Sequence, residues 1–208
     1  ARWHHFNFRL GAMVGLNRNM REVHLAPVYD DDGKVLIPRR TMRYDTLVMA
    51  LGSVSNDFGV PGVKEHCISL DTQAEASMFH RRLINACIRA QVQDSGMQSS
   101  PLNVAIIGCG ATGVELAAEL HNTTRELAAY GLDRIEPDRD VKLSIIEAAP
   151  RVLSALPEEL SLEVQRQLGK LNVALELGER VTKVDEQGVH TQSVRIVPAQ
   201  LVVWAAGI

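Results

Sequence analysis

The middle of the chain changes its hydrophobic pattern abruptly at a run of glycines. Residues 104–107 (VAII) are uninterrupted apolar positions, which is typical of a strand buried on both faces of a sheet. The run GCGATG follows directly, and the segment after it, up to Leu120, is rich in Ala, Leu and Glu. The pattern therefore predicts a strand, a glycine turn and a helix in immediate succession.

The three glycines of this turn have the G-x-G-x-x-G spacing, and each has its own physical task. Gly108 lets the chain leave the strand in a tight turn, Gly110 lets backbone amides approach a pyrophosphate, and Gly113 lets the helix lie close to its strand. Backbone amides at the start of the helix, at Ala111 and Thr112, face the same phosphates. In this strand and helix context the motif predicts a dinucleotide-binding site.

A second strand is predicted at residues 141–146, and it ends in Glu147. A carboxylate at this point accepts hydrogen bonds from the adenine ribose hydroxyls and repels the extra phosphate of NADPH. Glu147 lies 34 residues after Gly113, and a polar insertion before the strand accounts for the excess over the usual spacing of about 20. Arg151 could bind the 2′-phosphate of NADPH, but the Glu147 carboxylate favours NADH as the ligand.

The rest of the C-terminal half alternates between helical and strand patterns. A helix is predicted at 156–171, and strands are predicted at 173–177, 181–184, 189–197 and 201–205. The resulting fold class is α/β, a Rossmann-like domain with a parallel sheet and a β-meander crossover. The last strand should return beside the glycine loop.

The N-terminal half reads as a small antiparallel meander followed by a strand and a helix. Turn signals at 17–19 and 30–33 separate short apolar runs, a further strand is predicted at 44–51, and a helix at 71–93. Residues 94–100 (DSGMQSS) read as a linker. We therefore place a domain boundary near residue 100, between domains 1–100 and 101–208.

Composition excludes several function classes. The net charge of −3 and the scattered basic residues argue against nucleic-acid binding. Three distant cysteines indicate neither a disulfide framework nor a zinc site, and Cys109 inside the glycine turn is expected to be a small packing residue rather than a nucleophile. His4 and His5 lack a third metal ligand, and the acidic run 30–32 lacks the Glu of a calcium loop, so no metal is expected.

Four segments of the chain, in this order, resemble the type II NADH dehydrogenases, which are single-subunit members of the two-dinucleotide-domain flavoproteins. The segments are YDTLVMALGSVSNDFGVPGVKEHCISLDTQAEA, GCGATGVELAAEL, IIEAAPRVL and LVVWAAGI. The resemblance implies hydride transfer from NADH to FAD and delivery of electrons to a membrane quinone. The flavin carries that chemistry and the protein positions it.

The resemblance also implies roles for particular residues. Ala50 and Gly52 belong to the turn that passes near the FAD nucleotide, and Ala206 and Gly207 close on NADH, as does Val181. Glu115 is placed near the stacked nicotinamide and flavin as a catalytic candidate. Thr112 and Glu115 also have the spacing of a capping box, which would make Glu115 a purely structural residue.

Motifs that the family carries before residue 1 and after residue 208 are not in this sequence, so the chain is expected to be an incomplete part of a longer enzyme, inactive alone. Membrane contact is expected only through that further C-terminal region, with the complete protein peripheral on the cytoplasmic face, and a homodimer is left open. Two alternatives remain: another FAD/NAD(P) reductase of the ferredoxin or disulfide type, and a non-catalytic NADH-sensing module.

Overall fold

The computed structural model describes residues 5–92, 101–129 and 136–207, without the side chains of 90–92. The predicted linker at 94–100, His4 and part of the predicted insertion therefore lie outside the described residues. The chain divides into two compact units, Ala1–Gly52 and Ser53–Ile208, and each is described by itself.

The first unit is the predicted antiparallel meander. Its three-stranded sheet has the order β1-β2-β5, and a separate hairpin pairs β3 with β4. The strands are β1 (Met13–Asn17), β2 (Glu22–Leu25), β3 (Val28–Tyr29), β4 (Val35–Ile37) and β5 (Arg40–Arg43). The acidic run closes the β3–β4 hairpin, because Asp30 Oδ1 accepts the backbone N–H groups of Asp32 (3.1 Å) and Lys34 (2.8 Å). This confirms the predicted turn.

The prediction of a strand at 44–51 is wrong. This segment is irregular, and Val48 and Leu51 are 81% and 78% exposed. A strand is held by hydrogen bonds to a neighbouring strand, and within the described residues no strand pairs with this segment. An apolar run by itself therefore did not determine its structure.

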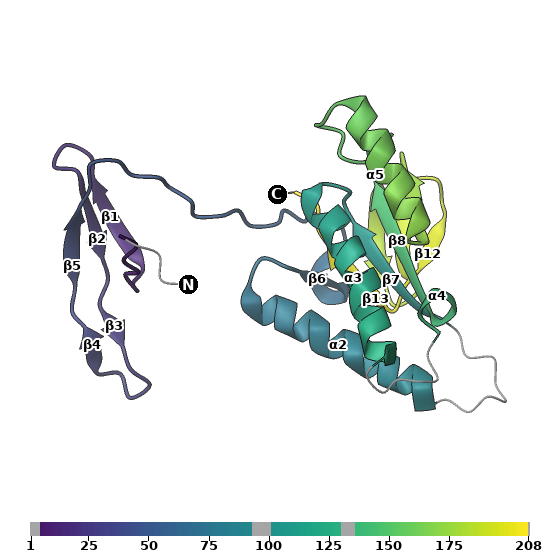
Figure 1. Cartoon of the computed structure of the whole chain (residues 1–208), viewed down its shortest axis with the longest axis horizontal. Coiled ribbons are helices and arrows are strands. Elements are labelled where there is room, and N and C mark those ends of the chain that lie inside the picture. The colour runs from purple at the N-terminus through teal and green to yellow at the C-terminus, as the bar shows by residue number, and fades with distance from the viewer. Residues whose placement is uncertain (1–4, 93–100, 130–135, 208) are drawn as a thin grey trace. The chain divides into compact units, whose positions relative to one another are not determined.

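The second unit is built on a five-stranded parallel sheet of order β6-β13-β7-β8-β9 (Figure 1). Its strands are β6 (Cys67–Ser69), β7 (Leu102–Ile107), β8 (Val141–Glu147), β9 (Val173–Leu177) and β13 (Leu201–Trp204). The last strand pairs in parallel with β7, so its carboxyl end returns beside the glycine turn as predicted. The α/β Rossmann-like fold class is confirmed.

Alternate residues of β7 point to two different cores. Val104 and Ile106 pack on the side covered by the helices α2 (Gln73–Val92), α3 (Ala111–Ala129) and α5 (Glu158–Lys170). Ala105 and Ile107 pack on the opposite side, against α1 (Val63–His66) and a three-stranded antiparallel sheet. Because both faces of the central sheet are covered, β13 is apolar throughout and β7 has Asn103 as its one polar residue.

The antiparallel sheet is the predicted β-rich crossover, with one difference. Its strands are β10 (Val181–Asp185), β11 (Gly188–Thr191) and β12 (Ile196–Pro198). The single strand predicted at 189–197 is two strands, because the Thr191 N–H donates to the Arg195 carbonyl (3.0 Å) and closes a turn over the polar residues between them.

Helix α2 begins with a capping box. Thr72 Oγ1 accepts the backbone N–H of Glu75 (3.2 Å), while Glu75 Oε2 accepts both the backbone N–H (2.9 Å) and the hydroxyl (2.8 Å) of Thr72. The reciprocal bonds satisfy amide groups that a helix start leaves unpaired. This confirms the cap predicted at residue 71 or 72.

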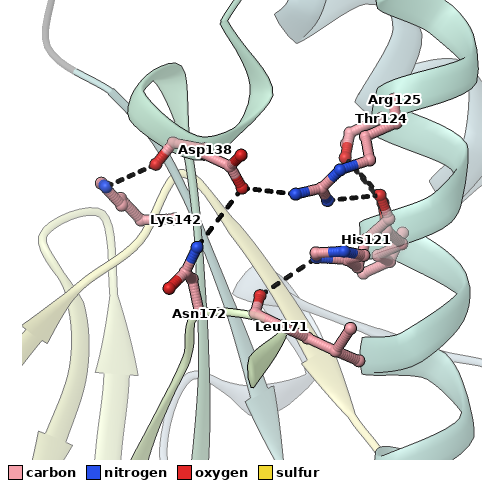
Figure 2. Close-up of polar contacts among 8 residues, drawn as sticks. His121, Thr124, Arg125, Asp138, Lys142, Leu171 and Asn172 are labelled. Atoms are coloured by element: carbon pink, nitrogen blue, oxygen red, sulfur yellow. Dashed lines mark hydrogen bonds and ion pairs between the residues drawn. The ribbon is translucent and has the colours of Figure 1, made fainter. Parts of the chain in front are cut away.

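The insertion before β8 is tied to the amino-terminal end of the sheet by polar contacts on Asp138 of α4 (Pro137–Asp140) (Figure 2). Its carboxylate accepts from Arg125 of α3 (2.6 Å) and from the side chain of Asn172 (3.4 Å). Its backbone carbonyl accepts from Lys142 Nζ (2.7 Å). Residues 136–140 are therefore anchored at the edge opposite the glycine turn.

The two compact units divide after Gly52, whereas the proposed domain boundary lies near residue 100. Strand β6 and helix α2, both before that boundary, pack on the sheet of the second unit. The boundary concerns the domains of a complete protein and stays a prediction.

Replacing Gly113 with Ala should destabilise the second unit. An added Cβ would lie 2.0 Å from the Gly108 carbonyl oxygen, so α3 would have to shift, at a cost of about 1–3 kcal/mol. Gly169→Ala in α5 is the matched control: its Cβ meets nothing within 4 Å, and it should be neutral or stabilising by up to about 1 kcal/mol. Urea unfolding midpoints measure both, and equal stability of the two variants would contradict the packing argument.

Candidate functional site

A cleft of about 410 Å³ opens at the carboxyl ends of β7, β8 and β13. Its lining comes from four parts of the second unit: the loop at 58–60, the ends of the three strands, the residues entering β10, and the chain after β13. The lining residues are Phe58, Val60, Ile107, Gly108, Ile146, Glu147, Ala148, Glu179, Arg180, Val181, Trp204 and Ala206. Ligands of open α/β sheets bind at this edge.

Gly108 of the glycine turn lines the cleft, and the three glycines of the turn differ in what surrounds them. Gly108 has φ +106°, and a Cβ there would lie 2.8 Å from the Ala205 carbonyl oxygen. Gly113 is held close to Gly108, as described above. Gly110 has open space around the position of a Cβ. Packing thus requires glycine at 108 and 113, whereas at 110 the structure leaves room for a ligand.

Glu147 joins the end of β8 to the glycine turn. Its Oε2 accepts the backbone N–H of Cys109 (2.7 Å), and its Oε1 accepts the backbone N–H of Ala149 (2.8 Å). A carboxylate has about four lone-pair positions, so two remain for further donors such as ribose hydroxyls. Glu147 therefore shapes the site and still has free acceptor capacity.

Arg151 is engaged by the loop that follows Glu147. Its guanidinium donates to the backbone carbonyls of Ser154 (2.6 Å) and Leu156 (2.7 Å) and to Ser161 Oγ (2.9 Å). The same loop is bound to the glycine turn, since the Leu153 N–H donates to the Cys109 carbonyl (2.9 Å). The Arg151 donors are thus used to hold the loop against α5.

The loop at 53–62 lies over the end of β13. The Asn56 carbonyl accepts the indole N–H of Trp204 (2.9 Å), and a Cβ on Gly207 would lie 2.7 Å from that same oxygen. Gly62, with φ +83°, packs so tightly that a Cβ would meet the Val184 carbonyl. Contacts between residues more than 100 positions apart therefore fix the wall that carries Phe58.

The chain was next compared with known proteins. The model of the pyridine nucleotide-disulphide oxidoreductase family matches residues 7–208. The chain belongs to this family. A type II NADH:quinone oxidoreductase of Haemophilus influenzae is 36% identical over 99% of the chain and 49% of the relative. The external alternative NAD(P)H-ubiquinone oxidoreductase B2 of Arabidopsis thaliana is 29% identical over 79% of the chain and 29% of its own length.

Solved structures share the fold. NDH2 from Plasmodium falciparum in complex with NADH superimposes with a TM-score of 0.67 at 21% identity, over 90% of this chain and 38% of that one. The resemblance to type II NADH dehydrogenases is thus confirmed, and the chain spans about half the length or less of these relatives. Among the described residues no helix has the length and apolar character to cross a bilayer.

The structure brings many of the predicted site residues of this family member together. Gly108, Glu147, Val181 and Ala206 line the cleft. The remaining turn residues Gly110, Ala111, Thr112 and Gly113 form the adjoining start of α3, and Gly207 follows Ala206. Ala50 and Gly52 belong to the first compact unit, where both are exposed.

Glu115 is the fifth residue of α3 and is exposed. Helix α3 begins at Ala111, so Thr112 is already helical and not in the cap position. Among the residues that the structure describes, no hydrogen bond or ion pair involves the Glu115 carboxylate. The capping-box interpretation is therefore wrong here.

The charged and aromatic residues of the cleft other than Glu147 were not among the predicted site residues. They are Phe58, Glu179, Arg180 and Trp204. Their positions depend on the pairing of β9 with β8 and on the folded loop at 53–62, and neither is visible in local sequence patterns. The one available signal was that Glu179 and Arg180 follow a predicted strand, as Glu147 does.

Cys109 is buried in the turn, with 1% of its surface exposed. Burial, with a smaller effect of the nearby Glu147 carboxylate, raises the pKa of the Cys109 thiol to about 11. The thiol is therefore protonated near neutral pH, which agrees with its interpretation as a packing residue.

We expect Cys109 to resist alkylation by iodoacetamide at pH 7.5 in the folded chain, because the thiolate is the nucleophile and little of it forms below a pKa of about 11. Labelling should rise with pH toward that value, and unfolding in urea should expose the thiol at once. Peptide mass spectrometry measures the extent. Rapid labelling of native Cys109 at pH 7.5 would contradict this assignment.

Proposed function

We propose that this chain is the NADH-binding part of a flavin-dependent NADH:quinone oxidoreductase. The observation that carries the proposal is the pairing of the glycine turn with Glu147 at a cleft on the carboxyl edge of the sheet. The similarity to type II NADH:quinone oxidoreductases supports the choice of quinone as acceptor over the ferredoxin- and disulfide-reductase types.

The parts of NADH would be held by different features of the cleft. The unpaired amides at the start of α3, from Gly110 to Thr112, would receive the pyrophosphate, aided by the helix dipole. Glu147 would accept hydrogen bonds from the adenine ribose, and the apolar side chain of Val181 would contact the adenine. Ala206 and Gly207 would close on the cofactor from the end of β13.

FAD would be held in part by the first unit. Gly52 has φ +71° and open space at the position of a Cβ, which fits close approach of a nucleotide to the backbone around Ala50 and Gly52. When bound, the flavin would supply the electron-transfer chemistry. Quinone reduction, peripheral attachment to the cytoplasmic face of the membrane and a homodimer are proposals for the complete protein.

Glu115 would face the reacting end of the dinucleotide. Its exposed carboxylate, with no partner among the described residues, is available to hold or pass a proton there. Because hydride transfer changes the charge of the flavin, a nearby carboxylate can assist the accompanying proton movement.

Gly110→Ala tests the dinucleotide site without disturbing the fold. Its Cβ meets nothing within 4 Å, so the thermal midpoint should match that of the parent chain, whereas a methyl group in the pyrophosphate approach should weaken NADH binding by about tenfold or more. Isothermal titration calorimetry with NADH measures the affinity, and Gly169→Ala is the control. Unchanged NADH affinity in Gly110→Ala, or no binding by the parent chain, would overturn the proposed site.

Glu115→Gln tests the proton role in the flavin-loaded protein. The expected result is a fall in kcat for NADH oxidation of about tenfold or more with little change in KM, because the amide cannot exchange the proton. Glu119→Gln, one turn further along α3 and also exposed, should leave kcat unchanged. Equal kcat in both variants would exclude Glu115 from catalysis.

A further inference from the structure

Glu179 is a second acid in the same cleft as Glu147. We propose that Glu179 determines coenzyme specificity together with Glu147, by disfavouring the 2′-phosphate that distinguishes NADPH from NADH. The proposal rests on the proposed function, because it concerns recognition of the adenine ribose in that site.

The backbone places Glu179 beside Glu147. Strands β8 and β9 are neighbours in the parallel sheet, and Glu147 is level with Leu177 at their carboxyl ends. Just beyond, the Glu179 N–H donates to the Glu147 carbonyl (2.9 Å), and the Gly178 N–H donates to the Ala149 carbonyl (2.9 Å). Glu147 and Glu179 therefore leave neighbouring strand ends, and both line the cleft in which the ribose is expected.

The Glu179 carboxylate is held in place and ionised. Its Oε2 accepts the hydroxyl of Ser193 (3.0 Å). Hydrogen bonds from the Thr191 and Ser193 side chains hold the pKa of Glu179 below its usual range. At neutral pH the cleft therefore presents two negative charges on this side.

Nearby cations offset these charges only in part. Arg195 contributes to the lowered pKa of Glu179, but its guanidinium is bound by Glu176 through two hydrogen bonds, of 2.8 and 3.2 Å. Arg151 donates to its own loop, as described above. Arg180 also lines the cleft and is exposed, so water and salt screen its charge as they screen that of Glu179. Among the lining residues two carboxylates thus face one guanidinium.

The expected size of the effect follows from Coulomb repulsion across a water-filled cleft. Two unit charges about 4 Å apart in water repel enough to weaken binding by about fivefold. A ribose without the 2′-phosphate lacks the second charge and is unaffected. Removing the Glu179 charge should therefore change NADPH binding selectively.

The experiment compares Kd values for NADH and NADPH by calorimetry in the parent chain, Glu179→Gln and Glu186→Gln. Glu186 lies in the exposed β10–β11 turn, outside the cleft lining. Glu186→Gln therefore removes the same charge without changing the cleft. Glu179→Gln should bind NADPH about three- to tenfold more tightly and NADH within about twofold of the parent, and the gain should shrink at high salt. Glu186→Gln should change neither affinity.

Three results would overturn the proposal. Unchanged NADPH affinity in Glu179→Gln would exclude a role in specificity, and an equal gain in Glu186→Gln would assign the effect to net charge. Equal loss of NADH and NADPH affinity in Glu179→Gln would make Glu179 a structural residue. If the parent binds NADH and only the Glu179→Gln result fails, the proposed function stands; if the parent binds neither nucleotide, both fall.

Discussion

The close approach of α3 to the glycine turn is the constraint on which the second unit depends. The Gly113 position lies so near the Gly108 carbonyl that a Cβ would overlap it, which brings the helix start down onto the end of β7. The same contact places the first helical turn, whose amides have no partner within the helix, directly after the turn that ends in the cleft at Gly108. Because β13 pairs with β7 in register, Ala205 then packs against Gly108, and the cleft wall follows from that pairing.

Glu147 holds the glycine turn in place and also lines the cleft. Its two carboxylate oxygens each accept a backbone N–H, one from the turn and one from the loop after β8. A residue with both duties is a poor probe of recognition, since removing its carboxylate would leave the buried Cys109 N–H without its partner as well as changing ligand affinity. Glu179 is bound through a hydroxyl of an exposed hairpin instead, so loss of its charge should disturb the backbone less.

The predictable part of the structure is the part in which local pattern and tertiary environment agree. Strands covered on both faces are rich in apolar residues, so residues 104–107 and the mostly apolar run 141–146 could be assigned from sequence. The G-x-G-x-x-G spacing located the turn between strand and helix. The segment 44–51 has an equally apolar pattern, yet it is irregular and exposed, because strand formation requires a partner that local sequence does not reveal. The capping box predicted for Thr112 and Glu115 failed for a different reason: their spacing was right, but the helix begins two residues too early for Thr112 to be its cap.

The cleft itself shows why recognition residues are harder to predict than the motif that marks the site. Trp204 reaches the Asn56 carbonyl across 148 positions of sequence, and Glu179 meets Glu147 only because β9 aligns beside β8. Neither contact has a local signature, since each follows from long-range pairing. Selectivity between NADH and NADPH depends on the summed charge around one ribose oxygen. It can therefore change through residues on a neighbouring strand end while the glycine turn stays the same.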